Sequence, residues 1–167
     1  MTVTIGSKIR VHIRWMIRKD MNEILRIERE AFANPWFEED FIRCLRQRNC
    51  IGMVAEHGEK VLGYMVYELH KGRLYIMNFA VNPDCNLRGV GTQMMEKLIG
   101  KLGTTDNKRT LINCHIRETN LEAQLFFKKC GFLCTKIVHD FYDNSSESAY
   151  LFEYFLDRSM NEPIYST

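Results

Sequence analysis

The sequence predicts a single α/β domain over 1–167, with a mixed, mostly antiparallel central sheet and about four flanking helices. Three observations support this prediction. The chain has 167 residues, the size of one domain with its own core. Its 46% hydrophobic and 26% charged residues are typical of a globular fold. Segments of two-residue and of helical periodicity follow one another, so we expect a core over 11–156 and a frayed tail over 157–167.

The first part of the chain predicts a strand followed by two helices. Residues 11–17 are short and β-prone. Asp20 and Glu23 have the spacing of a capping box, which predicts the start of the first helix. A second amphipathic helix, ending near Asn49, is predicted by the four-residue spacing of Phe37, Phe41 and Leu45.

The middle of the chain predicts three antiparallel strands. Two β-rich runs, 51–56 and 61–69, flank the turn residues 57–60 and predict a hairpin. Another turn separates them from a third run over 73–81, which Asn82-Pro83-Asp84 closes.

The last part alternates helices and strands. A glycine-bearing loop over 86–91 leads into a helix with an apolar stripe, which Gly103 ends. Thr119 and Glu122 predict the start of another helix, and Gly131 ends it. The remaining strands are expected at 110–116, 132–142 and 149–156.

Charge and hydropathy exclude several classes of partner. There are 23 basic and 21 acidic residues, and a net charge of +2 predicts no general attraction to nucleic acid or to an anionic membrane. No segment approaches the roughly 18 consecutive apolar residues of a membrane-spanning helix. Basic residues interrupt the N-terminal run, so no signal peptide is predicted and a cytoplasmic location is expected by default. As a separate expectation, the protein is a monomer or a weak dimer.

The cysteines and histidines do not predict a metal site. The six cysteines are scattered and form no C-x-x-C pair, so we expect free, mostly buried thiols. Four histidines do not have the spacing of metal ligands, either with one another or with the cysteines: His12, His57, His70 and His139.

The segment Arg88-Gly89-Val90-Gly91-Thr92 lies between a predicted strand and a predicted helix start. Such a loop directs backbone N–H groups and the positive end of the helix toward one point, which favours an anion. Glycine there allows a diphosphate to approach the backbone closely. No Gly-Lys-Ser/Thr follows, and Met94 replaces the third glycine of a dinucleotide fingerprint. Taken alone, the two glycines fit a simple tight turn equally well.

The residues around this loop carry a family resemblance. The string from Asn78 to Gly91, NFAVNPDCNLRGVG, resembles motif A of the GCN5-related N-acetyltransferases. The stretch from Arg117 to Phe132 resembles their motif B region, and 30–36 resembles the start of the ribosomal-protein-alanine N-acetyltransferase subfamily. The resemblance covers about 11–156 and implies a splayed sheet, an N-acetyltransferase activity and acetyl-CoA as the co-substrate.

The resemblance also implies the residues that bind acetyl-CoA. Backbone groups of one strand would hold the pantetheine arm, namely those of Phe79, Ala80 and Val81. The diphosphate would bind to the loop residues Leu87, Arg88, Gly89, Val90, Gly91 and Thr92. Asn120 and Phe127 would contact the cofactor as well. Asn86 departs from the family's Gln or Arg at its position, although Arg88 retains a cation nearby.

Two departures concern catalysis. His115 replaces the glutamate that serves the subfamily as general base, and a histidine can take that role near neutral pH or be a structural, hydrogen-bonded residue. Phe127 replaces the tyrosine that protonates the leaving thiolate. Tyr142 and Tyr150 are the alternative proton donors in place of that tyrosine, and Tyr142 is also expected to contact the acceptor. Trp36 either borders the groove that binds the acceptor or packs in the core.

Three functions remain open from the sequence. The first is acetylation of a protein N-terminus or peptide, with ribosomal proteins among the candidate acceptors and the acceptor lying between the first two helices and the last hairpin. The second is acetylation of a small amine or a lysine side chain. The third is a degenerate domain that binds acyl-CoA as a sensor or interaction module without turnover.

Overall fold

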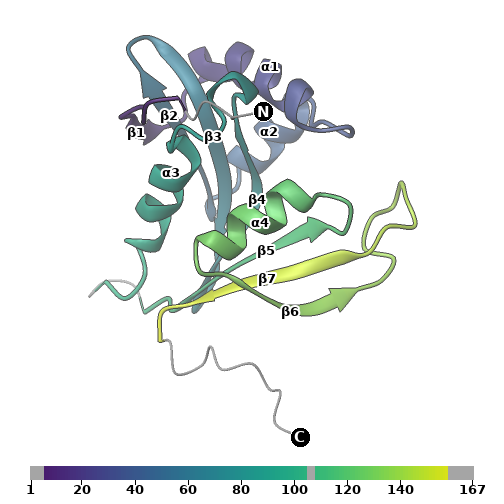
Figure 1. Ribbon diagram of the computed structural model, residues 1–167. Coiled ribbons are helices and arrows are strands. Elements are labelled where there is room, and N and C mark those ends of the chain that lie inside the picture. Colours follow the sequence, from purple (N-terminus) through teal and green to yellow (C-terminus); the bar gives the residue numbers. More distant parts are fainter. Residues whose placement is uncertain (1–5, 105–107, 158–167) are drawn as a thin grey trace, which may run out of the picture. The chain divides into compact units, whose positions relative to one another are not determined.

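A computed structural model describes residues 6–104 and 108–157. Its seven strands follow the order β1-β2-β3-β4-β5-β7-β6 (Figure 1). The pairs β1–β2, β2–β3, β5–β7 and β6–β7 are antiparallel, whereas β4–β5 is parallel. This confirms the predicted mixed, mostly antiparallel sheet.

The chain divides into two compact units. One contains Met1–Leu69 and Met77–Leu98, and the other contains His70–Ile76 and Ile99–Thr167, so that strand β4 contributes to both. The expectation of a single domain stays a prediction. Its frayed tail lies outside the described residues, apart from Asp157.

The first unit contains the N-terminal strands and three helices. Its strands are β1 (His12–Trp15), β2 (Cys50–His57), β3 (Lys60–Leu69) and the second half of β4 (Arg73–Val81). Its helices are α1 (Met21–Ala31), α2 (Glu38–Leu45) and α3 (Val90–Ile99), with short 3-10 turns η1 (Arg18–Asp20) and η2 (Pro83–Cys85).

The core of the first unit forms where α1 and α2 cover one face of the sheet. Ile24, Ile27 and Phe41 are fully buried against Tyr64 and Val66 of β3. On the same strand, a Cβ placed on Gly63 would lie 3.1 Å from the Met94 sulfur of α3, so α3 packs closely on the other face. Close packing on both faces therefore fixes β3, the neighbour of the strand β4 that precedes the glycine loop.

Two details at the helix starts differ from the prediction. The Asp20–Glu23 capping box is wrong, because the Asp20 carboxylate pairs with Arg14 at 2.8 Å and accepts from the Ile17 N–H. Glu23 instead accepts from the Val61 N–H at 2.9 Å. Phe37 is 69% exposed because it caps α2 rather than lying on its buried face.

The second unit contains the C-terminal strands and one helix. Besides the first half of β4 it consists of β5 (Leu111–Arg117), α4 (Leu121–Lys129), β6 (Leu133–Val138) and β7 (Ala149–Phe155). The predicted cap at Thr119 is wrong, because the Asn120 side chain accepts from the Ala123 N–H and begins α4. Strand β6 is an edge strand with a bulge between Cys134 and Lys136.

The cysteines are free thiols, as expected, and most are buried. Burial raises the pKa of the Cys50 and Cys114 thiols to about 12. The two exceptions to burial are Cys130, which is half-buried, and Cys134, which is exposed. Across the described parts of the chain, no helix is long and apolar enough to cross a bilayer. Nor do these parts contain a group of three or more His, Cys, Asp or Glu that could hold a metal ion.

Candidate active site

The glycine loop lies in the first unit, between β4 and α3. Asn82 begins the turn after β4, and its side chain accepts from the Asp84 N–H at 3.0 Å. Gly89 has a φ of +81°, a backbone conformation that favours glycine, and Leu87 has a φ of 62° and is 74% exposed. The predicted turn is therefore a left-handed loop that ends where α3 begins.

The loop leads directly into the first turn of α3. Val90 and Gly91 are buried there, and Thr92 follows them. The N–H groups of a first helical turn have no intrahelical acceptor, and the helix end carries partial positive charge. This part of the unit has the donor geometry that binds a phosphate.

The three predicted pantetheine residues end strand β4. Ala80 is 7% exposed and packs into the core beneath α1 and α2, while Phe79 and Val81 are half-buried. Asn78, immediately before them, donates from its side chain to Glu28. The strand segment is therefore held by both packing and a buried hydrogen bond.

A buried carboxyl group joins several elements of the first unit. Glu28 of α1 is 1% exposed and accepts from the Trp36 backbone N–H at 2.8 Å and from Asn78 Nδ2 at 3.0 Å. The Tyr64 hydroxyl also donates to it. Burial raises the pKa of Glu28, and the bonds from Trp36 and Asn78 act in the opposite direction. Its place on the buried face of a predicted helix was the sequence signal for this network.

Trp36 lies in the connection between α1 and α2. Its ring packs edge-on against Phe41, with ring centroids 5.2 Å apart, and it is half-buried. The structure thus places Trp36 at the border of the first unit's core, and a contact with an acceptor stays a prediction.

His115 lies on β5 in the second unit, beside strand β4. Its Nδ1 is 2.8 Å from the Tyr75 hydroxyl, and its ring stacks on Phe141 with centroids 4.2 Å apart. Burial lowers the pKa of His115 below 6.5, the positive charge of Arg73 adds to this effect, and Glu153 opposes it.

The partner of His115 was missed from the sequence. Tyr75 is paired in register with Asn113, two residues before His115, so all three side chains share one face of the sheet. The sequence alone left the hydrogen-bond partner of His115 unnamed, and in the structure the partner of its Nδ1 is the Tyr75 hydroxyl. Within the described ranges the buried Asn113 Oδ1 has no hydrogen-bond partner.

This arrangement can accept a proton at neutral pH. An imidazole with a lowered pKa is neutral at pH 7 and has one nitrogen with a free lone pair. When Nδ1 carries the hydrogen and donates it to the Tyr75 oxygen, Nε2 of His115 becomes the acceptor.

Tyr142 lies in the connection between β6 and β7 and is held by Arg117. The Arg117 guanidinium lies 3.7 Å from the centroid of the Tyr142 ring and donates to Glu147 at 2.8 Å and Ser145 at 3.2 Å. Burial raises the pKa of Tyr142 to about 12. The Tyr142 ring is therefore held in place by Arg117, and its hydroxyl is a weak proton donor.

Removal of Arg117 is expected to loosen this connection. Arg117→Ala deletes the contacts with Tyr142, Ser145 and Glu147, so the KM for a peptide acceptor should rise about tenfold while the Kd for acetyl-CoA stays within about twofold. Steady-state kinetics and calorimetry measure the two quantities. A rise in the acetyl-CoA Kd with an unchanged acceptor KM would contradict the expected contact between this connection and the acceptor. Lys129→Ala, on the exposed surface of α4, is the control.

The two remaining predicted cofactor residues have structural roles in the second unit. Asn120 is the N-cap of α4. Phe127 is 4% exposed and packs against Phe132 and Phe152, with ring centroids 4.9 and 6.3 Å away. A cofactor contact by either side chain stays a prediction.

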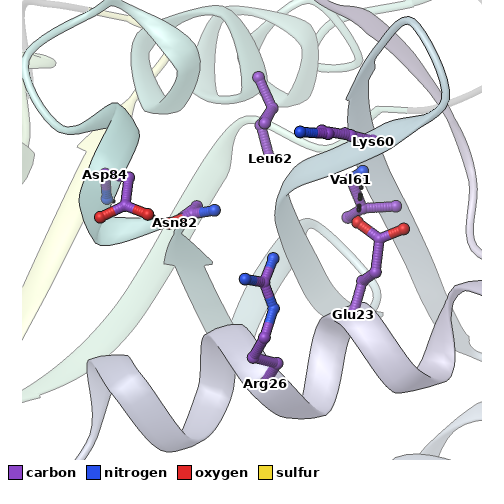
Figure 2. Close-up of a pocket in the computed structure, with 7 residues that line it drawn as sticks. All are labelled: Glu23, Arg26, Lys60, Val61, Leu62, Asn82 and Asp84. Atoms are coloured by element: carbon purple, nitrogen blue, oxygen red, sulfur yellow. Dashed lines mark hydrogen bonds between the residues drawn. The ribbon is translucent and has the colours of Figure 1, made fainter.

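A hollow of about 370 Å³ lies elsewhere in the first unit (Figure 2). It is lined by Glu23, Arg26, Lys60, Val61, Leu62, Asn82 and Asp84, none of which is a predicted site residue. In Figure 2 Glu23 and Arg26 project from the same helix, and the Glu23 carboxylate bonds the Val61 N–H. A second hollow of about 350 Å³ shares part of this lining and reaches Ile9 and Arg88, beside the glycine loop.

The fold and the glycine loop are those of an α/β protein with a candidate phosphate site, and comparison with known proteins identifies the family. Residues 19–132 match the model of the acetyltransferase (GNAT) family. The chain belongs to this family.

Individual relatives support the same assignment. An N-alpha-acetyltransferase of Sulfolobus acidocaldarius is 26% identical over 156 residues, 86% of this chain and 92% of that protein. A ribosomal protein bS18 alanine N-acetyltransferase of Escherichia coli K12 is 26% identical over 125 residues, 74% of this chain and 81% of that protein. Arabidopsis thaliana NAA60 in complex with acetyl-CoA superposes with a TM-score of 0.77 at 17% identity, covering 87% and 99% of the two chains.

The family fixes the class of reaction. The chain is an acetyl-CoA-dependent N-acetyltransferase, which confirms the family, the activity class and the co-substrate expected from the sequence.

Proposed function

We propose that this enzyme transfers the acetyl group of acetyl-CoA to the α-amino group of a protein N-terminus, with His115 as the general base. The lowered pKa of His115, beside Tyr75, carries this proposal. An α-amino group has a pKa of about 7.7–8.0 and is partly neutral near pH 8, whereas a lysine side chain, at about 10.4, is almost fully protonated. A weak general base is sufficient for the α-amino group, because this amine is already partly deprotonated.

The named acceptors of the relatives agree with this choice. One relative is named as an N-alpha-acetyltransferase and another as an enzyme for the alanine of ribosomal protein bS18. We therefore infer that the acceptor of this enzyme is the N-terminus of a peptide or protein, with ribosomal proteins among the candidates. In this proposal Trp36 and Tyr142 contact the acceptor.

The cofactor residues are assigned within the same proposal. The backbone of Phe79, Ala80 and Val81 holds the pantetheine arm, and the residues from Leu87 to Thr92 hold the diphosphate at the start of α3. Asn120 and Phe127 supply further contacts. The left-handed Gly89 and the buried Gly91 support the diphosphate role, since larger side chains there would obstruct the approach.

The reaction requires no covalent intermediate on the enzyme. The amine nitrogen attacks the thioester carbonyl carbon, a C–N bond forms, and the C–S bond breaks as coenzyme A leaves as a thiolate. The proton lost by the amine goes to Nε2 of His115. The thiol has a pKa of about 8.5 and leaves without a strong acid. The reaction therefore requires neither the hydroxyl that Phe127 lacks nor a proton from the weakly acidic Tyr142.

Tyr75 fixes the tautomer of His115 in this mechanism. Tyr75→Phe removes the hydroxyl that accepts the Nδ1 hydrogen, so kcat/KM should fall about tenfold with little change in acetyl-CoA affinity. The acid limb of the pH–rate profile should move as well, because the imidazole loses its partner. If kcat/KM instead fell as far as in the His115→Ala variant, the Tyr75 oxygen would be the group that accepts the proton.

Thiol release from acetyl-CoA with a panel of acceptors tests the function. Peptides with free N-termini should release thiol faster than the same peptides with a blocked N-terminus and an internal lysine, or than polyamines. Preference for lysine or a small amine would overturn the acceptor class. Acetyl-CoA binding without release on any acceptor would favour the sensor function instead.

A further inference from the structure

The residues before β1 lie across the glycine loop. The Ile9 N–H donates to the Arg88 carbonyl at 3.0 Å, and Arg88 Nε donates to the Ser7 carbonyl at 3.0 Å. We refer to residues 6–11 as the N-terminal strap. Both bonds join residues about eighty positions apart in the sequence, so the strap is a tertiary contact of the loop.

Gln93 of α3 holds the strap from the other side. Its Nε2 donates to the Ile9 carbonyl at 2.6 Å and to the Gly89 carbonyl at 3.0 Å, and its Oε1 accepts from the Val11 N–H at 3.2 Å. One side chain therefore ties together the strap, the loop and the helix. This supports a fixed position of the strap relative to Gly89.

The fixed strap places Lys8 on the glycine loop. The Cγ, Cε and Cδ atoms of Lys8 lie 3.3, 3.4 and 3.7 Å from the position of a Cβ on Gly89. The ammonium group is one bond beyond Cε, so a positive charge lies beside the loop. Lys8 is exposed, which leaves this charge accessible to a ligand.

The strap leaves the donors of the loop to a ligand. Its recorded bonds to the loop and to α3 use the Arg88 carbonyl and the side chains of Arg88 and Gln93, in the described part of the chain. The N–H groups of the first turn of α3 are not among them, and they are the groups that bind a phosphate. A phosphate can therefore occupy the loop with the strap in place.

The loop itself provides little positive charge toward a ligand. Its one charged residue over 86–91 is Arg88, whose side chain turns onto the strap, with its Cδ and Nε 3.2 Å from a Cβ on Gly6. Lys8 contributes a cation from outside the motif.

We propose that Lys8 binds a phosphate of coenzyme A and that the N-terminal strap is part of the cofactor site. The proposal rests on the proposed function, in which the glycine loop binds the diphosphate. Cations at such sites act through charge, so the contribution should weaken with added salt.

Calorimetric titration of the full chain with acetyl-CoA tests this proposal. Lys8→Met keeps the unbranched stem on Gly89 and removes the charge, so the Kd should rise about fivefold at low salt, as expected for one exposed ion pair. The difference should shrink in high salt, and Lys8→Arg should restore affinity. Lys71→Met, in the exposed turn before β4, is the matched control and should leave the Kd unchanged.

A second variant tests the strap. Gln93→Leu removes the side chain that holds Ile9 and Val11, so the Kd should rise in the same direction. In the double variant with Lys8→Met the effects should not add, because both changes remove the same contact. With acetyl-dephospho-CoA, a retained effect assigns Lys8 to the diphosphate and a lost effect assigns it to the 3′-phosphate.

Two results overturn the proposal in different ways. If Lys8→Met binds acetyl-CoA like the Lys71→Met control, or more tightly, Lys8 is not a phosphate ligand although the loop still binds the cofactor. If the wild-type chain shows no acetyl-CoA binding, the cofactor site itself fails, and the role of Lys8 fails with it.

Discussion

Replacement of His115 by alanine is expected to lower kcat/KM about 10²–10³-fold, the usual contribution of a positioned general base. His115 is half-buried, and its contacts with Tyr75 and Phe141 orient the ring rather than bind the cofactor. The Kd for acetyl-CoA should therefore change less than about twofold. Thiol-release kinetics and calorimetry on the same preparations measure the two quantities.

The pH dependence separates a catalytic His115 from a structural one. Because burial and Arg73 lower its pKa below 6.5, the base is neutral at pH 7, and activity should fall as the pH drops through that lower value. The alanine variant should lack this acid limb, and His115→Glu should recover part of the rate. His12→Ala, on the exposed side of β1, is the control. An alanine variant with wild-type activity would make His115 a structural residue.

Removal of the Glu28 carboxyl is expected to destabilise the protein by about 3 kcal/mol, because several buried donors lose their acceptor at once. Trp36, Tyr64 and Asn78 all donate to this group, and Glu28 is 1% exposed. Glu28→Ala also leaves a cavity beneath α1. Urea unfolding followed by circular dichroism measures the loss.

Two variants on the same helix show whether the network is responsible. Glu28→Gln keeps one acceptor oxygen and should lose clearly less stability than Glu28→Ala. Glu30→Ala changes an exposed carboxylate two residues away and should stay within about 0.5 kcal/mol of wild type. Equal losses for Glu28→Ala and Glu30→Ala would show that the buried bonds contribute little.

Local sequence signals predicted the elements that carry the cofactor loop. The third β-rich run, 73–81, coincides with β4, and the turn residues after it form η2 and the loop. Glycine at 89 was informative because its backbone has a positive φ, which few other residues adopt easily. The resemblance to the family motif was needed to identify acetyl-CoA as the ligand, since two glycines alone also fit a tight turn.

The contacts that set chemical behaviour were not accessible from the sequence. Tyr75 and His115 are 40 residues apart and meet only through the parallel register of β4 and β5. The Asp20–Glu23 spacing suggested a capping box, but the buried Asp20 carboxylate forms an ion pair with Arg14 instead. Which partner a side chain binds depends on residues that folding brings close, and local periodicity does not specify these residues.

The bulge in β6 has a consequence for how copies of the protein meet at high concentration. An edge strand offers unpaired backbone groups to other chains, and flat, apolar edges template intermolecular sheets. In β6 the bulge between Cys134 and Lys136 interrupts the regular register, and Lys136 adds a charge next to it. Together they make this edge a poor template for aggregation, although Leu133 and Ile137 are exposed along it.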